Sequence, residues 1–406
     1  MKKTNRWVYA VTGVVVLLFA GLVYAWSVMK PFIKAYGNGW TDAQMSLAFT
    51  LVMAFFCIGC LIAGFLSTKV KPRIYVIISG LLFCAGFFIA TLTTPDSLVM
   101  LYLGFSVLCG LGAGFAYNAV MSCISAWFPD KQGLISGILL MGFGLSAFII
   151  GKVFQAITAD GDGWKTTFHL FGIIIPILFF ACSFLFVRPG ADFVPPAGSG
   201  KKTVREPASD VNTSVMIKNP SFWLYYAWAI FTSAAGLVLV GQARSIAEQV
   251  SAGTIAAGTI VTVVGLISIM NGIGRVCFGM LFDKAGYRIT MIADMIVFVV
   301  ASLILMIALK SGSFTLLTAG FLVGGFAYGG VTPTNSAIIS DFFGRTHYSL
   351  NFSLINTNLL IASFATSISG KLYDATQSYM SSIIMMLVVT GAAFIVFLGI
   401  RRPDSK

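Results

Sequence analysis

The sequence predicts an all-α membrane protein whose twelve transmembrane helices form two pseudo-symmetric six-helix bundles. Composition is the first reason, because the 406 residues are 58% hydrophobic and only 10% charged, with a mean hydropathy of +0.91. A soluble domain carries roughly 25% charged residues, so most of this chain cannot face water. The other two reasons are a series of apolar stretches of about 20 residues, the length that spans a bilayer, and an internal repeat.

Twelve apolar stretches are separated by glycine, proline and charged turns. The first is too long and unbroken for a cleaved secretory signal, and no small-residue cleavage site follows it, so we interpret it as the first span. All seven cysteines lie in apolar stretches, which argues against a disulfide framework. The expected helices are residues 7–29, 44–67, 74–93, 97–124, 134–156, 166–187, 221–243, 257–282, 288–309, 314–340, 350–371 and 379–400.

Basic residues are distributed unequally between the two sides of these spans. If the N-terminus is cytoplasmic, 18 of the 26 Lys and Arg residues fall in cytoplasmic tails and loops, and seven fall on the outer side. Cytoplasmic loops are enriched in Lys and Arg, so we expect both termini in the cytoplasm. Short loops and the absence of a targeting sequence favour the cell (inner) membrane of a prokaryote. Because the net charge of +12 resides in these loops, it does not indicate a nucleic-acid partner.

One connection is long and polar and divides the spans into six and six. Residues 188–214 are rich in proline, glycine, serine and charge, as linkers are. The predicted organisation is an N-terminal bundle at 1–187, a cytoplasmic linker at 188–219 and a C-terminal bundle at 220–406.

The two halves resemble each other. "GFLSTKVKPR" from Gly64 matches "GMLFDKAGYR" from Gly279, 215 residues later. "GFAY" occurs at 114–117 and again at 325–328, and "GKVF" at 151–154 is echoed by "GKLY" at 370–373. All three matches fall at equivalent spans, which is typical of transporters built from two parallel repeats.

The C-terminal copy of the first repeat resembles the cytoplasmic loop motif of the major facilitator superfamily. It contains Asp283, Lys284 and Arg288, which the resemblance implies act in conformational gating. In the N-terminal copy the acid is replaced by Thr68. We therefore expect the contact made by the N-terminal copy to be the weaker one.

Arg275 lies in the apolar eighth span, within "NGIGRVCFG". A guanidinium at a helix centre costs about 2.5–3.5 kcal/mol to insert, and this one is about 12 Å inward of Asp283. Asp294, six residues after Arg288, is expected near the cytoplasmic surface, so the sequence offers no deep carboxylate as a permanent partner. We interpret Arg275 as the binding group for an anionic substrate, since a carboxylate at 4 Å gains about 4 kcal/mol at an effective dielectric constant of 20. The alternative is a structural arginine bonded to helix-end carbonyls, Asp283 or Asp294.

Polar groups that could contact such a substrate occur in several spans. Tyr24, Tyr117 and Tyr328 are candidates because a phenol donates to a carboxylate while its ring excludes water. The last two belong to the GFAY repeats, so pseudo-symmetry would place them on opposite walls of one central cavity. Packing between helices is the alternative role. The intramembrane asparagines are candidates either for substrate contact or for helix-to-helix hydrogen bonds: Asn118, Asn271, Asn351, Asn356 and Asn358.

Three quoted stretches carry a resemblance over essentially the whole chain: "NRWVYA…GLVYAWSV", "GFAYN…WFPDKQGLISG" and "NGIGRVCFGMLFDKAG". Together they resemble the oxalate/formate antiporter family, a branch of the major facilitator superfamily close to the monocarboxylate transporters. The resemblance implies transport of small organic anions by rocking of two halves. It also implies that Arg275 binds carboxylate, that the three tyrosines line the cavity, and that Phe143 is the aromatic of the fifth span.

One departure from the family bears on the substrate. The oxalate exchanger is known for a second cation, a lysine in the eleventh span, where this chain has "NFSLINTNLLIASFATSISGK" with no cation before Lys371. Two buried cations suit a dianion and one suits a monoanion. We therefore predict a monocarboxylate such as formate, lactate or pyruvate, with Asn356 or Asn358 in the place of the missing charge. Asn271 is a further predicted substrate contact.

Other functions remain as alternatives at this stage: an oxalate or dicarboxylate exchanger, or a transporter of an unrelated substrate class. An enzyme is not expected, because no HExxH, Walker loop, paired carboxylates or nucleophile-plus-base arrangement is found, and neither a cofactor nor a metal is expected. A sensing receptor would normally carry a soluble output domain. The expected partners are a small carboxylate, the lipid bilayer, and either protons or a counter-transported anion, with a monomeric chain.

Overall fold

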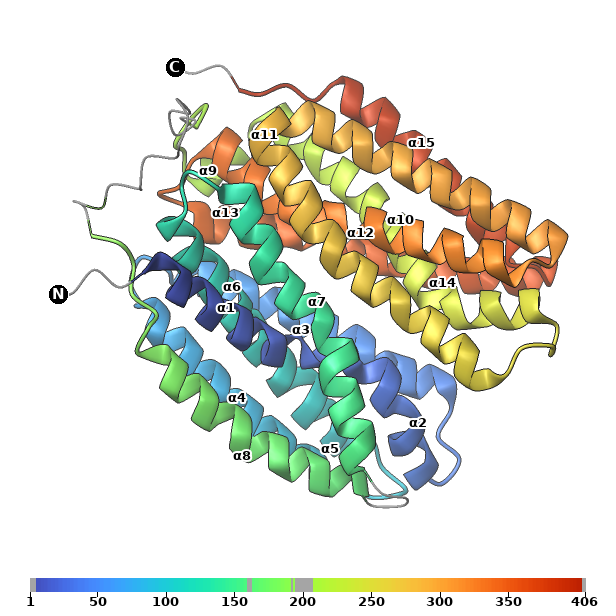
Figure 1. Cartoon of the computed structure of the whole chain (residues 1–406). Coiled ribbons are helices and arrows are strands. Elements are labelled where there is room, and N and C mark those ends of the chain that lie inside the picture. The colour runs from blue at the N-terminus through green and yellow to red at the C-terminus, as the bar shows by residue number, and fades with distance from the viewer. Residues whose placement is uncertain (1–4, 159–162, 191–192, 194–206, 404–406) are drawn as a thin grey trace. The chain divides into compact units, whose positions relative to one another are not determined.

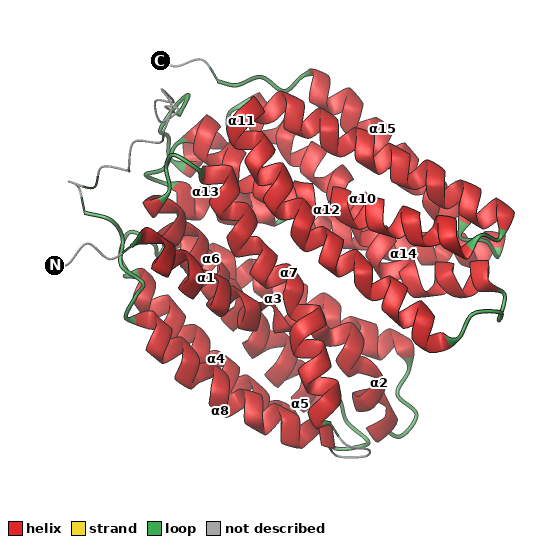
Figure 2. Cartoon of the chain, viewed as in Figure 1, coloured by secondary structure: helices red, strands yellow, loops and turns green. Residues whose placement is uncertain are grey.

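The computed structural model describes residues 5–158, 163–190, 193 and 207–403. Within these ranges the chain is almost entirely helical and contains no strand (Figure 2). The helices divide into two compact units. Unit 1 comprises residues 1–130, 142–204 and 348–354, and unit 2 comprises 131–141, 205–347 and 355–406. Figure 1 labels the helices.

Unit 1 holds the first six spans. Its helices begin where local signals favour them: Thr41 and Gln44 form a reciprocal capping box at the start of the second span, and Pro72 occupies the first turn of the third. The first span contains a 3-10 segment, and the fourth contains a π-helical one. The elements are α1 (Arg6–Ala20), η1 (Gly21–Ala25), α2 (Trp26–Tyr36), α3 (Asp42–Phe65), α4 (Pro72–Thr91), α5 (Val99–Leu101), η2 (Tyr102–Cys109), α6 (Gly110–Ile124), η3 (Ser125–Trp127), α7 (Gln132–Ile157, from Gly142 onward in this unit) and α8 (Gly163–Ser183).

Unit 2 holds the remaining spans. Asn219 caps the helix that follows the short α9, and Pro220 starts that helix. The eleventh span is interrupted at Thr357. The elements are α9 (Thr213–Met216), α10 (Pro220–Ser251), α11 (Ala257–Ser311), α12 (Phe314–Phe343), α13 (Tyr348–Asn356, of which the first residues belong to unit 1), α14 (Asn358–Thr376) and α15 (Met380–Leu398).

The described residues include 11 helices that are long and apolar enough to cross a membrane. One of them, Gly258–Ser311, has 54 residues, which at 1.5 Å per residue is about 80 Å, more than twice a bilayer core of about 30 Å. Its backbone leaves the helical region at Gly286 (φ 79°, ψ 179°), and the ribbon reverses direction there (Figure 1). The long helix is therefore two spans, and the predicted all-α fold with twelve crossings is confirmed.

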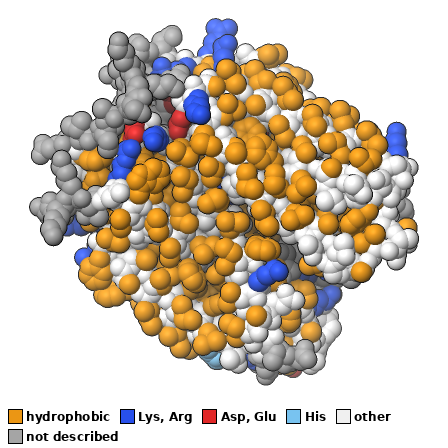
Figure 3. Space-filling model, in the orientation of Figure 1, with side chains coloured by type: hydrophobic (Ala, Val, Ile, Leu, Met, Phe, Trp, Pro, Cys, Tyr) orange, Lys and Arg blue, Asp and Glu red, His pale blue; other side chains and the backbone are white. Residues whose placement is uncertain are grey.

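Large apolar side chains lie on the outside of these helices. Leu398 is 77% exposed and Ile395 is 73% exposed, and hydrophobic side chains cover most of the face shown in Figure 3. Apolar surface of this extent belongs in lipid rather than in water. The protein is thus a multi-pass membrane protein.

Much of the predicted linker, including 191–192 and 194–206, lies outside the described residues. The part that is described lies along the end of α12. Ala208 N donates to the carbonyl of Asp341 at 2.8 Å, and the hydroxyl of Thr346 donates to Asp210 Oδ2 at 2.5 Å. The expected boundaries at 187 and 220 stay a prediction.

Candidate functional site

The first ten residues of α7 pack backbone to backbone against α11 within unit 2. A Cβ atom on Gly133 would collide with the carbonyl oxygen of Gly279, and one on Gly137 would collide with that of Arg275. Gly133 and Gly137 are one helical turn apart, so they form a small-residue seam on one face of α7. The seam sets the separation of the polar groups at its two ends, which are Asp283 and Arg275.

Asp283 lies at one end of the seam, over the N-terminus of α7. Its Oδ1 accepts from Gly133 N and its Oδ2 from Leu134 N, both at 2.8 Å. The carboxylate satisfies two of the amide groups that a helix start leaves without partners, and its charge complements the positive end of the helix dipole. Of the other predicted gating residues, Lys284 is exposed and Arg288 Nε donates to the hydroxyl of Tyr287 at 3.1 Å. The gating role itself stays a prediction.

Arg275 lies toward the other end of the seam, with only 8% of its surface exposed. Its Nε donates to Asn271 Oδ1 at 2.8 Å, one turn earlier on the same helix, and its Nη1 donates to the carbonyl of Leu140 on α7 at 2.6 Å. Both of these acceptors are neutral oxygens. A carbonyl partner was the structural alternative considered for this residue, although Leu140 lies inside α7 rather than at a helix end.

Asp294 is buried inside the protein, while its expected position near the cytoplasmic side of the membrane stays a prediction. It has no exposed surface, and neither carboxyl oxygen has a hydrogen-bond partner within the described part of the chain. Its Oδ1 lies so close to Gly330 on α12 that a Cβ atom there would collide with it. Counting residues from Arg288 does not reveal this burial, because it is set by the packing of α12 over α11.

The third aromatic candidate, Tyr328, is also in unit 2 and is 8% exposed. Its ring packs where a Cβ atom on Gly236 of α10 would stand. Gly329, the residue after Tyr328, lies against the α11 turn that holds Asn271 and Arg275, and a Cβ atom on Gly329 would be 2.8 Å from Arg275 N. Glycine on both helices therefore brings the arginine and the tyrosine-bearing helix into contact.

Asn356 and Asn358 flank the interruption of the eleventh span at Thr357. Asn356 is 1% exposed and Asn358 has no exposed surface. The amide of Asn358 donates to the carbonyl of Ala229 and to Ser233 Oγ, at 3.0 and 2.9 Å. Asn358 thus joins α14 to α10, which is the helix-to-helix role considered for it, while Asn356 remains the candidate for the place of the missing lysine.

In unit 1 the structure brings together the predicted aromatic residues. The ring centroids of Tyr24 and Phe143 are 5.3 Å apart, and those of Tyr117 and Phe143 are 5.2 Å apart, both edge-to-face. Phe56 completes the cluster at 5.2 Å from Tyr117, and Phe352 stacks on Tyr117 at 5.7 Å. Phe56 and Phe352 were not predicted, because nothing in an apolar stretch marks one phenylalanine among 36.

Asn118, one of the predicted helix-to-helix asparagines, connects α6 to α13. Its amide donates to the carbonyl of Ser349 at 2.9 Å and its Oδ1 accepts from Ser349 Oγ at 2.6 Å. Ser353 Oγ in turn donates to the carbonyl of Cys60 at 2.7 Å. This neutral network lies close to Gly64, where the degraded N-terminal loop motif begins.

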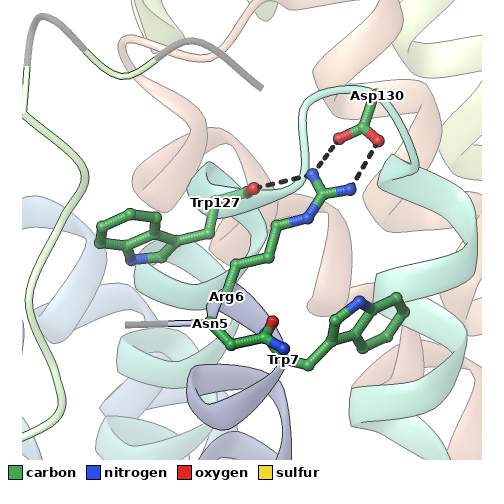
Figure 4. A network of polar contacts seen from close by, with 5 residues as sticks. All are labelled: Asn5, Arg6, Trp7, Trp127 and Asp130. Atoms are coloured by element: carbon green, nitrogen blue, oxygen red, sulfur yellow. Dashed lines mark hydrogen bonds and ion pairs between the residues drawn. The ribbon is translucent and has the colours of Figure 1, made fainter. Parts of the chain in front are cut away.

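The first and second motifs that carried the family resemblance meet in space, which sequence reasoning did not foresee. The guanidinium of Arg6, from "NRWVYA", binds both carboxylate oxygens of Asp130, from "WFPDK", at 2.5 and 2.9 Å (Figure 4). It also donates to the carbonyl of Trp127 at 3.3 Å. This bidentate pair fixes the start of α1 to the loop before α7.

Twelve apolar spans, with a buried arginine at position 275 in one of them, define the class of the described part of the chain: a multi-pass membrane protein with the architecture of a transporter. The model of the Major Facilitator Superfamily matches residues 10–270 and 242–406. The chain belongs to the Major Facilitator Superfamily.

Relatives of known name extend this assignment. The chain is 29% identical over 99% of its length to the oxalate:formate antiporter of Oxalobacter formigenes, of which it covers 94%. It is 24% identical over 84% of its length to monocarboxylate transporter 13 of Rattus norvegicus, of which it covers 75%. The predicted resemblance to the oxalate/formate antiporters and the monocarboxylate transporters is confirmed.

Solved structures agree on the fold. The proton:xylose symporter XylE superposes with a TM-score of 0.70 at 15% identity, over 99% of this chain and 98% of that one. A bacterial homologue of the iron transporter ferroportin gives the same TM-score at 13% identity, over 96% and 98%. At such identities the likeness concerns the fold alone.

Proposed function

We propose that this protein is a secondary active transporter of small monocarboxylates, in which Arg275 binds the carboxylate during alternating access. The observation that carries the proposal is the buried guanidinium of Arg275 inside an apolar span, with an amide and a backbone carbonyl as hydrogen-bond acceptors. Ionisable residues inside membrane helices mark substrate pathways more often than they serve as packing. The two named relatives supply the substrate class, since one is an oxalate:formate antiporter and the other a monocarboxylate transporter.

The geometry suggests how the arginine would take a substrate. The bond from Nε to Asn271 fixes the plane of the guanidinium, which presents its donors as a rigid fork suited to a carboxylate. The bond from Nη1 goes to a neutral carbonyl at Leu140, and a charged carboxylate is the stronger acceptor of the two. Substrate binding would therefore replace the Leu140 contact. The predicted substrate-binding phenol of this unit is Tyr328.

Arg275 is the one buried arginine among the described residues, and a single buried cation favours a monoanion over a dianion. The eleventh span carries Asn356 and Asn358 where a second cation would serve a dicarboxylate. Exchange of oxalate is the second candidate function, because the antiporter of Oxalobacter formigenes is named for it. Tyr24, Tyr117 and Phe143 stay predicted substrate contacts.

Transport by the protein in liposomes tests this proposal. We expect formate, lactate or pyruvate to exchange across the vesicle membrane, and Arg275→Gln to slow that exchange about 100-fold, the equivalent of about 2.7 kcal/mol. Arg275→Lys keeps the charge but loses the fork, so it should recover only part of the activity.

Arg244→Gln is the matched control, because Arg244 is exposed and pairs with Glu248 one turn away on α10. It should exchange substrate at the wild-type rate. A folded Arg275→Gln protein that exchanges carboxylates normally would refute the assignment.

We also propose that both termini face the cytoplasm of a prokaryotic cell, on the basis of the loop charges. A cysteine introduced at Gln377, which follows α14, should react with an impermeant thiol reagent added to intact cells, whereas one introduced at Ser405 should react only after the membrane is permeabilised. Labelling of the C-terminal cysteine in intact cells would refute the proposed orientation.

A further inference from the structure

Asp294 is a buried acid that the proposed substrate contacts do not use. Its side chain has no exposed surface, and neither oxygen has a hydrogen-bond partner among the described residues. An ionised carboxylate in such a place costs several kcal/mol when no donor or cation compensates it. A neutral carboxylic acid avoids most of this cost.

The charged and titratable groups around Asp294 are few. Tyr225 on α10 lies within electrostatic range of it and donates its hydroxyl to Asn335 Oδ1 on α12 at 2.6 Å. The other titratable groups of α12 are Tyr328 and Asp341, and Asp341 accepts from Arg402 at 2.9 Å. The helix α15 has none. Helix α10 also carries Tyr226, Arg244 and Glu248. The remaining ones belong to α11 itself: Arg275, Cys277, Asp283, Lys284, Tyr287, Arg288 and Lys310.

Two adjacent glycines of α12 contact the surroundings of Arg275 and of Asp294. Gly329 lies against the backbone of the α11 turn that carries Arg275, while Gly330 lies against the side chains of Asp294 and Phe278. Both contacts are close, so a displacement of α12 relative to α11 changes the surroundings of both charged groups.

We propose that Asp294 is the proton-binding site of this transporter and couples proton movement to carboxylate movement. This inference rests on the proposed function and adds its coupling ion. In the arrangement described here Asp294 holds its proton as a neutral acid. When the transport cycle admits water to it, the O–H bond breaks, the proton passes to water, and the electron pair stays on the carboxylate.

Proton and substrate charges balance in this scheme. One monocarboxylate carries a single negative charge and one proton a single positive charge, so net uptake of the pair moves no charge across the membrane. A difference of one pH unit is worth about 1.4 kcal/mol and would support a roughly tenfold accumulation of substrate. Exchange of one carboxylate for another needs no release of the proton from Asp294.

Two liposome assays on the full-length protein separate the possibilities. The first is accumulation of labelled lactate driven by an acidic exterior, and the second is lactate exchange at equal pH on both sides. We expect wild-type protein to perform both, Asp294→Asn to retain exchange and lose the accumulation, and Asp294→Glu to retain both. Asp374→Asn, which removes an exposed acid of α14, should behave as wild type.

A pH indicator gives an independent measurement on purified protein in weakly buffered detergent. Lactate should change the number of bound protons in the wild type and in Asp374→Asn but not in Asp294→Asn. Wild-type protein that exchanges lactate yet neither accumulates it with a pH gradient nor exchanges protons would overturn this inference and leave the proposed function standing. A folded Asp294→Asn protein that loses exchange together with accumulation would also overturn it. Absence of carboxylate exchange in the wild type would instead refute the proposed function.

Discussion

Asp283, on α11, caps the N-terminus of α7, and replacing Asp283 by alanine removes this carboxylate. The structure gives two hydrogen bonds, from Gly133 N and Leu134 N, each at 2.8 Å. A hydrogen bond to a charged group contributes about 1.5–3 kcal/mol, and loss of a helix cap costs about 0.5–2 kcal/mol. Asp283 is half-buried, so water can replace part of what is lost, and we expect the start of α7 to be destabilised by about 2 kcal/mol, a factor of about 30 in local opening.

Amide hydrogen exchange, measured by mass spectrometry, reports local opening at the start of α7 directly. A peptide covering 131–141 should exchange about 30-fold faster in Asp283→Ala than in the wild type, and Asp283→Asn should fall between them because one neutral acceptor remains. Lys284→Gln is the control, since that neighbouring side chain is exposed. Equal protection of the peptide in Asp283→Ala and wild type would show that the carboxylate does not hold the helix.

Two further predictions concern the asparagines. Asn118→Leu removes both hydrogen bonds between Asn118 and Ser349 and leaves the buried Ser349 hydroxyl without its acceptor, so the thermal unfolding midpoint in detergent should fall by the equivalent of about 1–3 kcal/mol. An unchanged midpoint would exclude a stabilising role for the network. Asn356→Lys adds a second buried cation, so it should increase exchange of oxalate relative to formate in liposomes, whereas continued exclusion of oxalate would count against the one-cation explanation of specificity.

The fold was predictable because a bilayer imposes it. Twenty apolar residues in a row have few structures available to them in lipid other than a helix, so composition and turn residues were enough to place the spans. The reversal between the eighth and ninth spans was marked by Gly286, whose φ of 79° few other residues adopt. The 3-10 segment at Gly21–Ala25 was not marked, because a glycine inside an apolar stretch is compatible with an undisturbed helix.

The candidate site was predictable only in part, for a physical reason. A lone arginine in an apolar span stands out in any sequence, since its burial is expensive. The burial of Asp294 depends on which helix covers it, and that is a matter of tertiary packing by α12. The pair of Arg6 and Asp130 joins residues 124 positions apart, and sequence spacing carries no information at that range.

Asn271, one turn before Arg275, is neutral, and this explains why the buried arginine and the buried acid lie at different places. A carboxylate at position 271, one turn from the guanidinium, would pair with it in place and compete with any anionic substrate. The amide of Asn271 orients the same nitrogen without a charge, so the arginine keeps its attraction for a carboxylate. The acid instead lies at Asp294, against Gly330 of α12, the residue after the glycine that meets the turn of Arg275. An anion site and a proton site that contact adjacent residues of one helix can respond to the same movement without a hydrogen bond between their charged groups, as a carrier of an acid and its proton requires.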